Sequence, residues 1–245
     1  MSAPVFIADP VALHASDRVL LDGDEGRHAA VARRIAVGEV VELTDGRGNL
    51  ARCVVVAADR NGITCDVQAR STIQEPQPRI VVAQAVPKGD RGETAVETMT
   101  EVGVDEILPW SAARCIVRWK GDRGEKSLRR WRATAREAGK QSRRAWLPDV
   151  GELTSTKALA ERLRGAAVGI VLHEEAAEPL GAVTLPERGE IVLVVGPEGG
   201  ITPDELAVFE AAGAVVARLG PTVLRTSTAG TVAAGVLLAR TGRWA

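Results

Sequence analysis

Two glycine-rich loops in the last fifth of the chain hold the residue types best suited to chemistry. Residues 196–200 read GPEGG and follow residues 191–195, a short β-branched run typical of a buried strand. Gly220 and Pro221 interrupt the chain after a second such run, residues 215–219. In an open α/β sheet, ligands bind outside the carboxyl ends of the strands. The two loops therefore predict a small-molecule site.

A tight turn that needs positive φ is the alternative explanation for GPEGG, and it stays open for this loop taken alone. Neither loop has the GxxxxGK[ST] or GxGxxG pattern of a phosphate-binding loop. A helix is predicted directly after the first loop, because Thr202 suits the N-cap, Pro203 the first helical position and Glu205 the third position of a capping box. A second, Thr/Ser/Ala/Gly-rich helix is predicted from Ser227 or Thr228. Two loops that each lead into a helix favour the ligand interpretation.

The His173-Glu174-Glu175 run could suggest a metal site, but no second histidine follows at ligand spacing. We therefore predict no metal. Cys53, Cys65 and Cys115 are widely spaced and form no CxxC motif. They suit the reducing cytoplasm and indicate neither a disulfide framework nor a zinc site.

A strongly basic segment precedes the glycine loops. Residues 114–144 contain twelve basic and three acidic residues. A helix is predicted over residues 125–141, and helical spacing places five basic residues on one stripe: Arg129, Arg132, Arg136, Lys140 and Arg143. A solvated surface is the ordinary explanation of such a stripe. So few acidic neighbours favour contacts with RNA phosphates.

The first 72 residues indicate a small β domain. Strands are predicted over residues 40–43, 52–57 and 63–69, with glycine-rich turns between them, which is typical of a small barrel. A helix is predicted over residues 25–35. It would carry Arg27, Arg33 and Arg34 on a basic face that is either solvated or RNA-binding. Residues 75–79, with two prolines, are expected to form a linker.

The remainder of the chain alternates strands with helices. Strands are predicted over residues 80–86, 103–109 and 168–172, with helices ending near Glu101 and covering residues 156–164. This rhythm implies a parallel sheet in an α/β fold. The net charge is −1 and 45% of residues are hydrophobic, which indicates a soluble globular protein. No apolar run approaches the length of a membrane span, and no signal peptide is apparent.

These motifs, in this order, resemble the RsmE family of 16S ribosomal RNA (uracil-N3)-methyltransferases, which belong to the SPOUT class. The matching segments are HAAVARRIAVGEVVELTDGRG from His28, KGDRGETAVETMTEVGVDEILP from Lys88, QSR from Gln141, LHEEA from Leu172, GPEGG with Glu205, and LGPTVLRTSTA from Leu219. The chain departs from the family pattern at Met99, Thr222 and Ser227, where lysine, arginine and glutamate are usual. An arginine often found near the start is also absent.

The resemblance implies a two-domain protein. Residues 1–74 would form a PUA-like RNA-binding β-barrel, and residues 75–245 a SPOUT α/β domain with a C-terminal trefoil knot. It also implies S-adenosyl-L-methionine as cofactor, 16S ribosomal RNA or the small ribosomal subunit as partner, a homodimer, and work in the cytoplasm. Small residues in the final predicted helix, residues 228–240, permit close packing in the core or across a dimer.

The resemblance and the loop positions together give candidate site residues. The cofactor-binding candidates are Leu172, His173, Gly196, Pro197, Glu198, Gly199, Gly200, Ile201, Leu219, Gly220, Val223, Leu224 and Thr228. The RNA-binding candidates are Arg33, Arg34, Lys88, Arg91, Arg129, Arg132, Arg136 and Arg143.

Arg225 is the catalytic candidate, as a fixed cation beside O2 or O4 of the uracil ring. An arginine that only pairs with an acid or an RNA phosphate is the alternative. Arginine is a poor general base, so another group must accept the N3 proton. Water and Glu198 are both candidates for it.

Two other functions remain open from the sequence. A SPOUT enzyme could methylate a ribose or a different base. A non-catalytic RNA-binding assembly factor could keep the fold without the activity, and the departures at Thr222 and Ser227 are the only support for this alternative.

Overall fold

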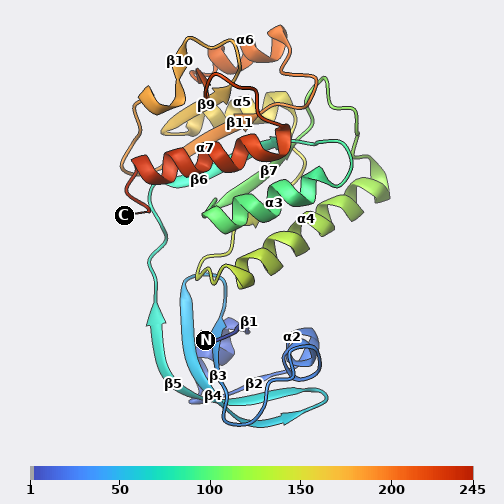
Figure 1. The fold of residues 1–245 in the computed structure, drawn as a ribbon, viewed down its shortest axis with the longest axis vertical. Helices are drawn as coiled ribbons and strands as arrows, with labels where there is room; N and C mark the ends of the chain where they lie inside the picture. The colour runs from blue at the N-terminus through green and yellow to red at the C-terminus, as the bar shows by residue number, and fades with distance from the viewer. Residues whose placement is uncertain (1–2, 245) are drawn as a thin grey trace. The chain divides into compact units, whose positions relative to one another are not determined.

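The computed structural model describes residues 3–244, and the chain divides into two compact units. The first unit runs to Glu75 and also takes in the later segment Gly139–Leu147. The second unit comprises Pro76–Ala138 and the chain from Pro148 onwards (Figure 1). The chain therefore passes from the second unit into the first and back again around the end of one helix.

The first unit is built on a five-stranded sheet with the order β1-β3-β4-β5-β2. Its strands are β1 (Val5–Ile7), β2 (Arg18–Leu21), β3 (Val40–Thr44), β4 (Asn49–Asp59) and β5 (Gly62–Thr72). Strand β1 pairs with β3 in parallel, and the other pairings are antiparallel. The three strands predicted from the sequence are confirmed. The short elements β1, β2 and α1 (Pro10–Ala15) were not predicted, because three to six residues give too little periodicity to recognise.

The predicted helix over residues 25–35 is wrong in its extent. Helix α2 spans Gly23–Arg27 and continues as a π-helical turn over His28–Ala32. Arg33 follows this turn, and Arg34 has a left-handed φ of 53°. A non-glycine residue with positive φ ends a helix. Arg33 and Arg34 are exposed, but they lie beyond the helix and not on its face.

The segment Gly139–Leu147 docks on the β3–β4 turn of the first unit. The Gly48 amide donates to Ala145 O at 2.9 Å, and the Leu147 amide donates to Gly46 O at 2.9 Å. Gly48 has φ +95°, and a Cβ there would lie 2.7 Å from Nε1 of Trp146 in the docked segment. The DGRG sequence of this turn therefore suits both its backbone conformation and the close approach of the docked segment.

The second unit holds a seven-stranded parallel sheet with the order β10-β12-β9-β11-β6-β7-β8. Its strands are β6 (Arg79–Ala85), β7 (Glu106–Trp110), β8 (Asp149–Val150), β9 (Val168–Leu172), β10 (Glu178–Pro179), β11 (Glu190–Val195) and β12 (Val215–Arg218). Its helices are α3 (Arg91–Val102), α4 (Gly121–Gln141), α5 (Thr156–Gly165), the short 3₁₀ helix η2 (Leu180–Ala182), α6 (Pro203–Ala211) and α7 (Thr226–Arg240). None of the helices in the described part of the chain is long and apolar enough to cross a membrane.

Helices cover both faces of this sheet. Along β11, Ile191, Leu193 and Val195 pack with α3, α4 and α7, whereas Val192 and Val194 pack with α5 and α6. This two-residue alternation between two apolar layers explains why the strand reads as a continuous hydrophobic run. Strand β12 was expected to be fully buried, but Val215 and Val216 are half-buried and Arg218 is exposed. It has only the two-residue strand β10 on its outer side.

The predicted basic stripe is correct for part of α4 only. The helix ends at Gln141, and Arg143 has φ +58°, so Arg143 does not continue the stripe. Acidic partners also come from outside the segment. Arg132 donates to Val150 O at 3.1 Å and to Glu152 at 2.7 Å, and the buried Lys140 Nζ lies 3.0 Å from Glu25 Oε1.

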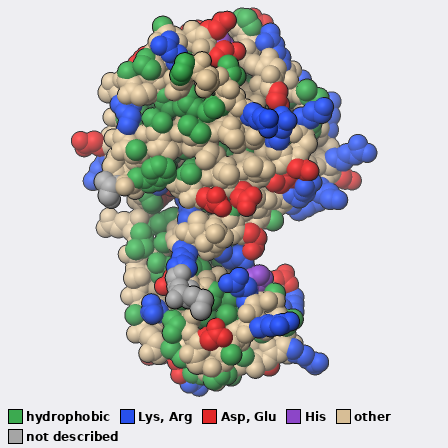
Figure 2. All heavy atoms as spheres, in the orientation of Figure 1, with side chains coloured by type: hydrophobic (Ala, Val, Ile, Leu, Met, Phe, Trp, Pro, Cys, Tyr) green, Lys and Arg blue, Asp and Glu red, His purple; other side chains and the backbone are tan. Residues whose placement is uncertain are grey.

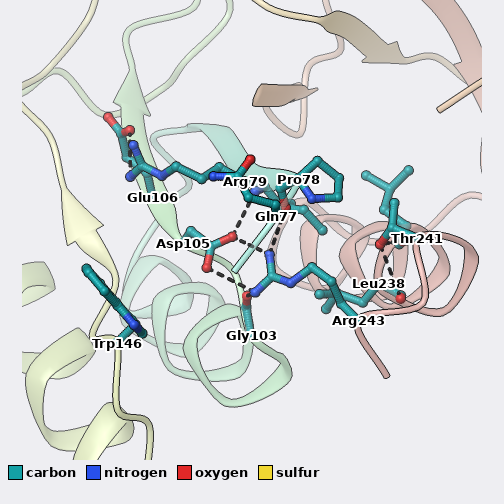
Figure 3. A network of polar contacts seen from close by, with 12 residues as sticks. Gln77, Pro78, Arg79, Gly103, Asp105, Glu106, Trp146, Leu238, Thr241 and Arg243 are labelled. Atoms are coloured by element: carbon teal, nitrogen blue, oxygen red, sulfur yellow. Dashed lines mark hydrogen bonds and ion pairs between the residues drawn. The ribbon is translucent and has the colours of Figure 1, made fainter. Parts of the chain in front are cut away.

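A buried ion pair fixes the end of the chain to the start of the sheet (Figure 3). The Arg243 guanidinium donates to the Asp105 carboxylate and to the carbonyl oxygens of Pro78 and Gly103. Asp105 Oδ2 also accepts the Ile80 amide at 2.8 Å. Removal of either charge would leave the other unpaired in a nearly closed site. The pair holds the C-terminal end of α7 against the N-terminal ends of β6 and β7.

The three cysteines are buried, and none forms a disulfide within the described residues. Burial raises the pKa of the Cys53 thiol to about 11 and that of the Cys65 thiol to about 12. Burial also raises the pKa of Cys115. These thiols stay protonated at neutral pH and act as small apolar core residues.

Candidate functional site

A cleft of about 360 Å³ lies where the carboxyl ends of β9, β11 and β12 meet the start of α7. Three segments form most of its wall, namely the turn after β9, the GPEGG loop after β11 and the loop between β12 and α7. The lining residues are Arg91, Leu172, His173, Glu174, Val195, Gly196, Pro197, Glu198, Gly200, Ile201, Leu219, Gly220, Thr222, Val223, Leu224, Arg225, Thr226 and Ala229. The two glycine loops thus meet at one cleft at the carboxyl ends of the strands.

All the cofactor-binding candidates from the sequence line this cleft except Gly199 and Thr228. Gly199 lies in the same loop but faces Arg114, whose Nη1 donates to its carbonyl oxygen at 3.0 Å. Thr228 lies in the first turn of α7, where its hydroxyl donates to Arg225 O at 3.1 Å. The geometry brings the candidates together; the ligand contact of each residue stays a prediction.

The GPEGG loop needs its glycines for two different reasons. Gly200 has φ +74°, a conformation that L side chains rarely adopt. A Cβ at Gly199 would lie 3.0 Å from Arg114 Cβ, so a side chain there would require the neighbouring segment to move by a few tenths of an ångström. A backbone this compact lets a ligand contact peptide groups directly.

The buried Glu205 carboxylate holds this loop in place. Its Oε2 accepts the Thr202 amide at 3.1 Å and the Thr202 hydroxyl at 3.0 Å, which completes the predicted capping box. Its Oε1 accepts the Ala113 amide at 2.7 Å and the Thr156 hydroxyl at 3.1 Å. One carboxylate therefore joins the start of α6, the chain after β7 and the start of α5.

Glu198, in the middle of the GPEGG loop, contacts the loop between β6 and α3. Its Oε1 accepts the Lys88 amide at 3.2 Å and lies 3.6 Å from Arg91 Nη1. Arg91 itself lines the cleft. Lys88 and Arg91, predicted to bind RNA, are thus placed beside the predicted cofactor loop, and both are exposed.

Arg225 occupies the N-cap position of α7 and lines the cleft. Its backbone carbonyl accepts the amides of Thr228 and Ala229, at 2.9 and 3.0 Å. Its guanidinium is exposed and takes part in no hydrogen bond or ion pair within residues 3–244. The cation is therefore available to a ligand in the cleft.

The cleft includes residues that the sequence analysis did not assign to it. These are Glu174, Val195, Thr222, Thr226 and Ala229. Glu174 could have been found, because it belongs to the LHEEA segment that resembles the family motif. Thr222 reaches the cleft although it departs from the family pattern, whereas Ser227, the other departure in this segment, is buried in α7. Within residues 3–244 no group of three or more His, Cys, Asp and Glu side chains could hold a metal ion.

Two family models match the chain. The RNA methyltransferase domain model matches residues 74–238, and the RNA methyltransferase PUA domain model matches residues 21–68. The first match covers most of the second unit and the second covers most of the β sheet of the first.

Individual relatives agree with these matches. The chain is 52% identical over 230 residues to ribosomal RNA small subunit methyltransferase E of Mycobacterium tuberculosis (strain CDC 1551 / Oshkosh), covering 92% of this chain and 87% of the relative. It is 29% identical over 217 residues to the protein of the same name from Bacillus subtilis (strain 168), covering 85% of each. A crystal structure of a ribosomal RNA small subunit methyltransferase E from Neisseria gonorrhoeae, bound to S-adenosyl methionine, superposes with a TM-score of 0.86 and 26% identity, covering 98% of both chains.

Replacement of Glu205 tests the bracing of the GPEGG loop. In Glu205→Gln the side-chain amide group would face backbone and hydroxyl donors that now bond to a carboxylate oxygen. We expect the free energy of unfolding to fall by about 1–3 kcal/mol, because a buried donor loses its acceptor. Glu210→Gln, on the exposed side of the same helix, is the matched control and should change it little. Urea denaturation measures both, and equal losses would remove Glu205 from this role.

Proposed function

Since the chain belongs to the RsmE family of RNA methyltransferases, we propose that it methylates N3 of one uridine in 16S ribosomal RNA with S-adenosyl-L-methionine. The observation that carries this proposal is the cleft itself. Two glycine loops enclose it, and an arginine without a protein partner among the described residues lines it.

The residues of the cleft fit this cofactor. Leu172, Ile201 and Leu219 supply apolar surface for a flat base, and the glycine loops supply peptide groups for hydrogen bonds. Its volume lies within the range of small-molecule sites. S-Adenosylmethionine supplies a methyl group already activated on a sulfonium. The protein's tasks are therefore to align the uracil ring, to exclude water and to make the N3 lone pair available.

Arg225 addresses the last of these tasks. N3 of uridine is protonated at neutral pH, and its lone pair becomes available only as the proton leaves. Negative charge then spreads onto O2 and O4. A guanidinium beside one of these oxygens would stabilise that charge. Arg225 suits the role because its side chain is not occupied by another described group.

Finer features of the fold are also proposed here. We assign residues 1–74 to a PUA-like RNA-binding barrel and residues 75–245 to a SPOUT domain, although Gly139–Leu147 packs with the first unit. After β12 the chain returns as α7 onto α3, where the Thr98 and Thr231 hydroxyls lie 2.6 Å apart. We also propose that this C-terminal segment forms the trefoil knot that the family resemblance implies.

A homodimer in the cytoplasm is the assembly we expect. Val223, Val232 and Trp244 are exposed by 79%, 46% and 55%, and large exposed apolar patches mark interaction sites. Figure 2 shows hydrophobic side chains gathered on the face of the second unit where α7 lies. A second copy of the chain would cover such a surface.

The surface of α4 is the proposed RNA contact of the second unit. Arg129 and Arg136 are exposed, and Arg129 has an acidic neighbour on its own helix, Glu125, at 3.5 Å. Such an exposed pair is weak, so an RNA phosphate can replace the carboxylate. Figure 2 shows Lys and Arg side chains on the side of this unit where α4 lies. Arg33, Arg34 and Arg143 remain candidates on loops of the first unit.

The function is tested by mapping modified nucleotides in ribosomal RNA from a strain that lacks the gene. We expect one uridine of the small-subunit RNA to lose its N3-methyl group. The purified protein with S-adenosylmethionine should restore it. Loss of a ribose methyl group or of another base methyl group would indicate a different target. An unchanged modification pattern would favour a non-catalytic assembly factor.

Calorimetry on the purified protein should show binding of S-adenosylmethionine, and absence of binding would contradict the cofactor assignment.

Arg225→Ala tests the role of the cation. Methyl transfer in a single turnover should slow by about a hundred- to a thousandfold, because the charge on O2 and O4 is no longer stabilised. Affinity for RNA should change much less. Arg188→Ala, at an exposed position before β11, is the control for loss of an arginine. If the whole loss appears in RNA binding and the bound complexes react at the normal rate, Arg225 is a phosphate anchor.

Arg129→Ala with Arg136→Ala tests the α4 surface. The double variant should bind RNA more weakly, and the slope of log affinity against log salt should flatten by about 0.7–0.9 for each phosphate that is no longer neutralised. Affinity for S-adenosylmethionine should barely change. Arg164→Ala on α5 provides the control for net charge, since this residue pairs with Glu161. A salt slope equal to that of the unchanged protein would show that these arginines belong to a solvated surface and do not contact RNA.

A further inference from the structure

Removal of the N3 proton requires an acceptor, and the proposed function leaves that acceptor open. Three side chains that line the cleft can accept a proton, namely His173, Glu174 and Glu198. The arginines of the cleft cannot, because a guanidinium stays protonated in proteins. The choice among these three side chains rests on the proposed function.

His173 is unsuitable because its free nitrogen is already engaged. Its Nδ1 accepts the Glu175 amide at 3.2 Å. A neutral imidazole that accepts at Nδ1 carries its proton on Nε2. The nitrogen left for the cleft is therefore a donor. His173 can hold an oxygen or nitrogen acceptor of a ligand, but it cannot take the N3 proton without breaking its present bond.

The two carboxylates differ in how firmly they are held. Glu174 lies in the turn after β9 and is exposed, and no donor within residues 3–244 bonds to its carboxylate. Glu198 is held at one oxygen, because Oε1 accepts the Lys88 amide at 3.2 Å and lies 3.6 Å from Arg91 Nη1. No described group donates to its Oε2. A general base must be positioned before the reaction, and only Glu198 has one oxygen fixed while the other stays available.

We propose that Glu198 Oε2 is the acceptor of the N3 proton. The N3–H bond breaks and its proton moves to the carboxylate, while the electron pair left on N3 forms the new bond to the methyl carbon. The carbon–sulfur bond of S-adenosylmethionine breaks, and its electron pair stays on sulfur. The products are N3-methyluridine, the uncharged thioether and protonated Glu198, which returns its proton to water. Arg91 acts as a positioning residue that orients the carboxylate.

The test is the pH dependence of single-turnover methylation by Glu198→Gln. The substrate is small-subunit RNA from the strain that lacks the gene. The glutamine oxygen can still accept the Lys88 amide, so the loop keeps its main contact. Near neutral pH the variant should react about a hundred- to ten-thousandfold more slowly than the unchanged protein. Its rate should then rise about tenfold per pH unit as hydroxide removes the proton instead, whereas the unchanged protein should show a much shallower rise.

A merely structural role for Glu198 would lower the rate equally at every pH, and parallel profiles would therefore overturn the proposal. Glu174→Gln is the rival arm, and a hydroxide-dependent profile there but not in Glu198→Gln would assign the proton to Glu174. Glu187→Gln, at an exposed position before the start of β11 and so at the opposite end of that strand from the loop, controls for the loss of a charge.

A second variant covers the case in which Glu198→Gln fails to bind S-adenosylmethionine. Glu198→Asp keeps a carboxylate one methylene further back, so it should react slowly but keep the shallow profile of the unchanged protein. A hydroxide-dependent profile for this variant would also overturn the proposal. If the unchanged protein itself forms no N3-methyluridine in the same assay, the proposed function fails, and not this assignment of the proton.

Discussion

The buried Glu205 carboxylate is the contact on which the cleft depends. It accepts four hydrogen bonds from three segments of the chain that are up to 92 residues apart in sequence. All four donors are amides or hydroxyls. Hydrogen bonds to an ionised acceptor are about twice as strong as neutral ones, and the N-terminus of α6 adds favourable potential. The carboxylate is thus satisfied without a cation. The GPEGG loop, which joins β11 to α6, is consequently held at its α6 end, and the pairing of β11 in the sheet holds its other end.

A fixed loop explains the arrangement of charges around the cleft. Glu198 extends from that loop and contacts the Lys88 amide and Arg91. These contacts hold the segment before α3 next to the cleft. Arg114 holds the same loop from another side through the Gly199 carbonyl. The segments expected to bind RNA and the segments expected to bind the cofactor therefore both contact the GPEGG loop. Methyl transfer between two bound molecules gains most when both are held in a fixed relation.

The sequence predicted the local features of this site and not its long-range contacts. The capping box at Thr202 and Glu205 was predictable, because its two residues are three apart and their types are specific. The strands were predictable because two buried faces leave a continuous apolar run. The second pair of Glu205 contacts, and the contact of Glu198 with Arg91, join residues far apart in sequence, and no spacing rule reports them. Arg143 was misplaced for a related reason. In the sequence, the spacing of basic residues continues past Gln141 as it would in a helix. In the structure, the backbone at Arg143 is left-handed, and the helical stripe ends before this residue.

Arg225 breaks a local rule at the place where function would require it. An N-cap position favours Ser, Thr, Asp or Asn, because a side-chain oxygen can accept a free amide of the first helical turn. Arg225 provides no such bond, and its positive charge lies at the positive end of the α7 dipole. The dipole alone disfavours a cation there by about 0.3–1 kcal/mol. Nothing in the packing of α7 requires an arginine at this position, since the side chain is exposed. A locally unfavourable residue that lines a cleft is best explained by what it does for a ligand. The same helix N-terminus that makes Arg225 costly also favours negative charge nearby, so in the proposed reaction Arg225 and the α7 amides would act in the same direction on a uracil oxygen.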